Sequence, residues 1–124
     1  MPDVGAPAPS FRLLDQHGNP VSLDDFAELE GWSRVDVIKM DIEGSEERAL
    51  RGMRNLSKRS SDLRLIMEFN PMAMDRAGVS REILRIQLRE LGFRHSFVIE
   101  RGMRSLEPDI LPSARAVCNL LFTK

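Results

Sequence analysis

The sequence predicts an α/β fold, with helices packed on a mostly parallel sheet that one antiparallel strand closes. Two apolar runs, 35–40 and 63–69, are each followed by residues at helical spacing, which is typical of parallel strands joined by helices. The last two apolar runs, 93–99 and 117–122, follow one another without a helical pattern between them. This second observation indicates the antiparallel closing strand.

Composition fits one soluble domain of 124 residues, with 42% hydrophobic and 30% charged residues. A net charge of -1 provides no basic surface for nucleic acid or for an anionic membrane, so neither is an expected partner. The chain shows no signal-peptide pattern at its start and no apolar run near the roughly 18 residues of a spanning helix. We therefore expect a cytoplasmic protein without a membrane partner.

The N-terminal part predicts a hairpin, then a helix, then the first confident strand. Ser10–Leu14 and Val21–Leu23 flank a polar turn, which indicates paired edge strands. A short helix is predicted over Asp24–Leu29, with Gly31 as its stop, before the strand Val35–Met40.

In the middle of the chain one helix is predicted from Ser45, its N-cap, to Leu56. A polar loop over 57–62 leads to the strand Leu63–Phe69, which Pro71 prevents from continuing.

The longest helix is predicted over 79–91, with its apolar face marked by Val79, Ile83 and Ile86. Between the last two strands, residues 100–115 form a proline-containing loop that could reach over a site.

Polar residues gather where two neighbouring strands end. Asp41 and Glu43 follow the strand 35–40, and Glu68 ends the next strand, with Asn70 just beyond it. Ligands bind outside the carboxyl ends of strands in open α/β sheets, so Asp41 and Glu43 are candidate catalytic residues and Glu68 and Asn70 candidate substrate contacts. Lys39 shares the strand face of Asp41 and is either a further substrate contact or its ion-pair partner.

These acids also have a structural interpretation. An aspartate with an ordinary pKa of about 3.9 is a poor general base unless burial or neighbouring carboxylates raise that value, or unless it positions a metal. The alternative is that the acids complement a helix dipole and accept hydrogen bonds from loop amides. That alternative applies to Glu43 and more strongly to Glu46 and Glu47.

No metal site is predicted, because His17 and His95 have no cysteine or histidine at ligand spacing. Cys118 is the single cysteine and lies in an apolar run, which favours a buried structural thiol.

The stretch Val35–Glu46, the segment Ala49–Gly52, the strand that ends in Glu68 and the run Asn119–Phe122 together resemble the C-terminal half of FkbM-type methyltransferases. The resemblance extends over residues 21–124. It implies a partial Rossmann-like methyltransferase sheet over 31–124, preceded by the hairpin and connecting segment 1–30. It also implies S-adenosylmethionine as cofactor, a small-molecule hydroxyl as acceptor, and an Asp41 that faces the methyl donor or orients that hydroxyl.

A full enzyme of this kind has a glycine-rich loop after its first strand and an acidic residue after its second. The chain contains no Gly-x-Gly spacing, and about 34 residues before the first confident strand are too few for the missing strands. We therefore expect a truncated domain, inactive alone, whose strand 35–40 has a bare edge that self-association or a complementing N-terminal half covers. The alternative is a non-catalytic remnant or interaction domain.

Residues 4–26 are also similar to the opening hairpin of peroxiredoxins, which leaves a redoxin-related fusion or a chance match as a further alternative. Those enzymes need a thiolate near the start of an early helix, whereas Cys118 lies near the other end of the chain.

Overall fold

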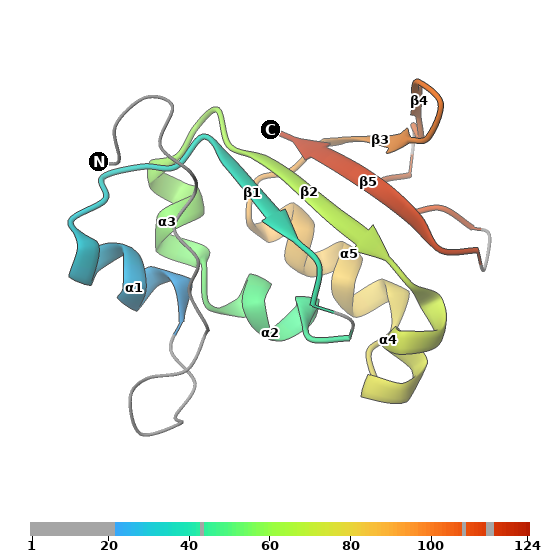
Figure 1. Ribbon diagram of the computed structural model, residues 1–124, viewed down its shortest axis with the longest axis horizontal. Coiled ribbons are helices and arrows are strands. Elements are labelled where there is room, and N and C mark those ends of the chain that lie inside the picture. Colours follow the sequence, from blue (N-terminus) through green and yellow to red (C-terminus); the bar gives the residue numbers. More distant parts are fainter. Residues whose placement is uncertain (1–21, 43, 108, 114–115) are drawn as a thin grey trace.

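The computed structural model describes residues 22–42, 44–107, 109–113 and 116–124. Helices and strands alternate in the first two thirds of this part, and strands dominate the last third (Figure 1). The elements are α1 (Leu23–Glu30), β1 (Val37–Met40), α2 (Glu46–Arg51), α3 (Arg54–Arg59), β2 (Arg64–Phe69), α4 (Pro71–Ala77), α5 (Arg81–Glu90), β3 (His95–Ile99), β4 (Met103–Ser105) and β5 (Cys118–Thr123).

The strands form one five-stranded sheet in the order β1-β2-β5-β3-β4. Only β1 and β2 pair in parallel, while β5 pairs antiparallel with both β2 and β3, and β4 antiparallel with β3. The α/β class is confirmed, but the expectation of a mostly parallel sheet with one antiparallel strand is wrong. The final strand inserts between β2 and β3, and a short hairpin adds β4, so antiparallel pairs outnumber the single parallel pair.

The described helices lie on one side of this sheet (Figure 1). Strand residues alternate accordingly: Leu65, Met67 and Phe69 of β2 are buried with Leu120 and Phe122 of β5. The intervening residues point to the opposite side, which no described helix covers and which we call the open face. Its members include Val37, Lys39, Ile66, Glu68, Phe97 and Leu121.

Helix α1 begins where a strand was expected. The Ser22 side chain accepts a hydrogen bond from the backbone N–H of Asp25 at 3.1 Å, so Leu23 starts a capped helix and the predicted strand end at Leu23 is wrong. The carboxylate of Asp24 then accepts hydrogen bonds from the backbone N–H groups of Asn55 (3.0 Å) and Leu56 (2.7 Å), which ties α1 to α3. The rest of the predicted hairpin lies outside the described residues.

The single helix predicted from Ser45 to Leu56 is two helices, α2 and α3, interrupted at Gly52 and Met53. A Cβ at Gly52 would lie 2.8 Å from the Cβ of Ser22, so the chain passes closely under α1 at this break. Helix α3 continues to Arg59, through part of the predicted loop.

Two elements were not predicted, and one helix buries a different face. Helix α4 follows β2 directly, and β4 lies within the expected loop 100–115. In α5 the buried residues are Leu84 and Leu88, whereas Ile83 and Ile86 are 46% and 48% exposed.

No helix in the described ranges is long and apolar enough to cross a membrane.

Candidate functional site

Asp41 and Glu68 each come one position after the last paired residues of β1 and β2. The last paired position of the parallel ladder joins Met40 to Met67, so the next position along each strand carries an acid. Glu68 lies on the open face of β2, and Asp41 follows the open-face residue Lys39 at an interval of two. The predicted juxtaposition of these two acids is therefore consistent with the backbone register.

Few interactions hold these side chains. Lys39 and Asp41 are exposed and Glu68 is half-buried, and within the described residues none of the three side chains forms a hydrogen bond or ion pair. Lys39 and Asp41 therefore do not form the ion pair that was the alternative to a substrate contact. Asn70 instead caps α4, because its Oδ1 accepts a hydrogen bond from the backbone N–H of Ala73 at 3.1 Å. Its role as a substrate contact stays a prediction, and Glu43 lies outside the described residues.

In contrast to Asp41, the nearby Glu46 is buried. Glu46 is only 6% exposed, and its Oε2 accepts a hydrogen bond from the backbone N–H of Gly44 at 2.8 Å. The expected Ser45 side-chain cap is absent, so Glu46 closes the turn instead. The sequence indicates that Glu46 is buried, because it precedes Ala49, Leu50 and Met53 by three, four and seven residues, the spacing of one helix face.

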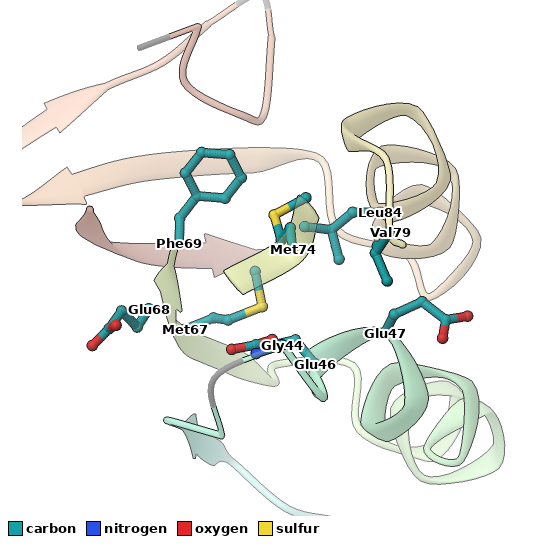
Figure 2. A pocket seen from close by; sticks show the side chains of 9 residues that line it. All are labelled: Gly44, Glu46, Glu47, Met67, Glu68, Phe69, Met74, Val79 and Leu84. Carbon is teal, nitrogen blue, oxygen red and sulfur yellow. Dashed lines mark hydrogen bonds between the residues drawn. The ribbon is translucent and has the colours of Figure 1, made fainter. Parts of the chain in front are cut away.

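A small hollow lies beside Glu46 (Figure 2), with room for about one water molecule. Five of the residues that line the hollow are apolar. The carboxylate of Glu68 points away from Met74 and Leu84, which lie on the opposite side of the hollow. The lining residues are Gly44, Glu46, Glu47, Met67, Glu68, Phe69, Met74, Val79 and Leu84. A space of this size accommodates no methyl acceptor.

Gly44 makes the turn between β1 and α2 possible. Its φ of +87° is disfavoured for residues with a side chain, and an added Cβ would lie 3.1 Å from the carbonyl oxygen of Ala73. We expect Gly44→Ala to lower the free energy of unfolding by about 1–3 kcal/mol, through backbone strain and the crowded carbonyl.

Gly78→Ala is the matched control, since Gly78 has a φ of +72° but open space around it. Urea unfolding should show the smaller loss for Gly78→Ala. Equal losses would mean that the contact with Ala73 contributes nothing.

Glu47 belongs to a structural network rather than to the open face. Its carboxylate accepts hydrogen bonds from the guanidinium of Arg51 and from Nε2 of Gln87, the latter at 2.8 Å, which joins α2 to α5. The hydrogen bond from Arg51 lowers the pKa of Glu47 below the ordinary glutamate value; burial acts in the opposite direction, and Gln87 assists Arg51.

This lowered pKa predicts acid sensitivity. Because the folded-state pKa of Glu47 is lower than its unfolded value, its contribution to stability is present above the unfolded pKa and is lost as pH falls through the folded one. We expect the Tm of the wild type to fall more than that of Glu47→Gln as pH decreases from about 5 to 3. Parallel Tm curves would contradict this assignment.

Cys118 lacks the properties of an activated thiol. It is partly buried at the start of β5, and burial, assisted by the nearby charge of Glu100, raises its pKa. A raised pKa disfavours the thiolate that peroxidase chemistry requires. In the described part of the chain, no group of three or more histidine, cysteine, aspartate or glutamate side chains could hold a metal ion.

Comparison with known proteins identifies the family. The profile of the Methyltransferase FkbM domain matches residues 19–95. Searches of curated proteins and of solved structures found no match. Because the matched segment covers more than half of the 124 residues, the chain belongs to the FkbM methyltransferase domain family.

Proposed function

We propose that this chain forms the acceptor-binding side of an S-adenosylmethionine-dependent O-methyltransferase. The observation that carries the proposal is the placement of Asp41 and Glu68 at adjacent strand ends, one position beyond the last paired residues of β1 and β2. Family membership supplies the reaction class, and two neighbouring carboxylates suit the recognition of a hydroxyl.

The acidic strand ends and the hollow beside Glu46 do not fit the cofactor itself. Adjacent Asp41 and Glu68 would repel the carboxylate of its methionine portion, and the hollow beside Glu46 has room for about one water molecule. The chain also has no Gly-x-Gly spacing to approach a nucleotide closely. We propose that a complementing N-terminal half supplies the cofactor pocket.

Asp41 would then act on the acceptor. When bound, S-adenosylmethionine supplies an electrophilic methyl group. The carboxylate of Asp41 would accept a hydrogen bond from the acceptor hydroxyl, orient its lone pair and receive its proton, while Glu68 and Lys39 hold neighbouring polar groups. These roles are assigned only to side chains that form no hydrogen bond within the described structure.

The test is methyl transfer by assembled halves. The full chain is mixed with an N-terminal half from another FkbM-family member and with S-adenosylmethionine carrying a tritiated methyl group, and hydroxylated small molecules are screened for label. We expect transfer by the mixture and none by this chain alone. A mixture that forms a stable complex, binds cofactor and still transfers no label to any hydroxyl would contradict the proposal.

A non-catalytic interaction domain is the second candidate. The observation in its favour is that no described side chain fixes Asp41 or Glu68 by a hydrogen bond, whereas catalytic groups are usually held by a supporting shell. In that case, the assembled halves would bind each other but transfer no label.

A further inference from the structure

A cleft opens between helix α4 and the turn that joins β1 to α2. Its volume is about 370 Å³, which is within the range of small-molecule sites. Ser45 and Arg48 line one side of it, and Ala73, Arg76 and Ala77 of α4 line the other. Unlike the hollow beside Glu46, this cleft has room for a ligand.

Close packing fixes the two sides of the cleft relative to each other. A Cβ at Gly44 would lie 3.1 Å from the carbonyl oxygen of Ala73 and 3.5 Å from the Cβ of Ala77. The turn and α4 are therefore in contact within the cleft. Because of this contact, the backbones that carry Arg48 and Arg76 are held at a set separation.

Both sides present donor side chains to the cleft. Ser45 and Arg48 are three residues apart, so they are neighbours on the surface of α2. On α4, Arg76 and Ala77 follow Ala73 by three and four residues, the spacing of one helix face. Two small side chains therefore flank a single guanidinium and leave space in front of it.

The donors have no competing partner among the described residues. There, the guanidinium groups of Arg48 and Arg76 form no hydrogen bond or ion pair, and Ser45 makes no side-chain cap. Glu47 is the one acid in the described lining, and its carboxylate already accepts hydrogen bonds from Arg51. The described lining therefore has an excess of positive charge.

We propose that this cleft binds a small molecule through a phosphate monoester group, which Arg48 and Arg76 hold from opposite sides. A phosphate monoester carries a charge of about −1.5 to −2 at pH 7 and three acceptor oxygens. It therefore matches two guanidinium groups and the Ser45 hydroxyl. A carboxylate carries one charge in one plane and is satisfied by a single bidentate arginine.

Both arginines also lie in the last turns of their helices, where they complement the helix dipoles. That role accounts for one charge on each helix, but it does not require the two charges to line the same cleft. The inference needs only the cleft and its charges, so it stands apart from the proposed function.

Titration of the isotope-labelled full chain with methyl phosphate tests the proposal, with backbone amide chemical shifts as the readout and ionic strength held constant. We expect saturable shifts at Gly44, Ser45, Ala73 and Ala77, and weaker binding of acetate. The affinity should fall as pH decreases from about 7.5 to 5.5, because the monoester loses its second charge near pH 6.

Substitution of each arginine tests its part in binding. Arg48→Gln and Arg76→Gln should each weaken the affinity roughly tenfold, since each removes a charge-assisted hydrogen bond. Arg76→Lys should have an intermediate affinity, because it keeps the charge and loses the planar fork. Circular dichroism confirms that each variant is folded.

Arg89→Gln is the matched control, because Arg89 is an exposed helix arginine outside the cleft. Its affinity should stay within about twofold of the wild type. The proposal would be overturned by the absence of saturable shifts with methyl phosphate, or by acetate binding at least as tightly. Equal weakening by Arg89→Gln would also overturn it, since binding would then reflect the general charge of the surface.

Discussion

Replacing Phe122 by alanine is expected to lower the free energy of unfolding by about 3–5 kcal/mol. Phe122 is fully buried on β5, the strand between β2 and β3, and its ring lies 6.2 Å from that of Phe93, between centroids. The substitution removes the contact with the Phe93 ring and leaves a cavity beside Leu65, the residue opposite on β2. Since domains are stable by about 5–15 kcal/mol, this loss is a large share of the total.

Leu29→Ala in α1 is the control, because Leu29 is 82% exposed. Its effect should stay within about 0.5 kcal/mol. Urea unfolding followed by circular dichroism measures both variants. A loss below 1 kcal/mol for Phe122→Ala would mean that the helix-covered side of the sheet is not the core.

The second large effect is on catalysis by the assembled halves. Asp41→Asn keeps the size of the side chain and one acceptor oxygen but cannot take the acceptor proton. We expect kcat to fall roughly 10²–10⁴-fold. Glu68→Gln should mainly raise KM, because its proposed role is to hold the acceptor. Initial rates of tritium transfer against acceptor concentration separate the two effects.

Asp36→Asn provides the matched control at the opposite end of β1. Asp36 is an exposed acid that lies 3.7 Å from Arg34, away from the proposed acceptor site. Its kcat and KM should stay within about twofold, as for surface substitutions remote from chemistry. If Asp41→Asn retained wild-type kcat, Asp41 could not be the proton acceptor.

The long elements of the fold were predictable because continuous apolar runs and capping residues fix them locally. The strands near 37–40 and 64–69 follow from such runs, and α5 lies within the helix predicted over 79–91, although the structure starts it after the Ser80 cap. Which face of that helix is buried was not predictable. Ile83 and Ile86 have the same helical spacing as an internal face, but contacts with the sheet select Leu84 and Leu88.

Shorter elements depended on contacts that sequence spacing does not contain. The break at Gly52 arises where α1 passes within contact distance, and α1 is distant in sequence. Helix α4 is different, since its signals are local: Asn70 caps it, Pro71 is its first residue and Gly78 ends it with a φ of +72°. The positions of Asp41 and Glu68 after neighbouring strands were predictable, and the burial of Glu46 could have been inferred from its helical spacing to Ala49, Leu50 and Met53.

Calorimetric titration with S-adenosylmethionine tests the central claim most directly, namely that this chain supplies the acceptor side of a methyltransferase and lacks the cofactor pocket. The account predicts no heat with this chain alone and saturable binding, one cofactor for each complex, once an N-terminal half is added. Absence of binding by a stable complex of the two halves, or tight binding by the chain alone, would contradict it.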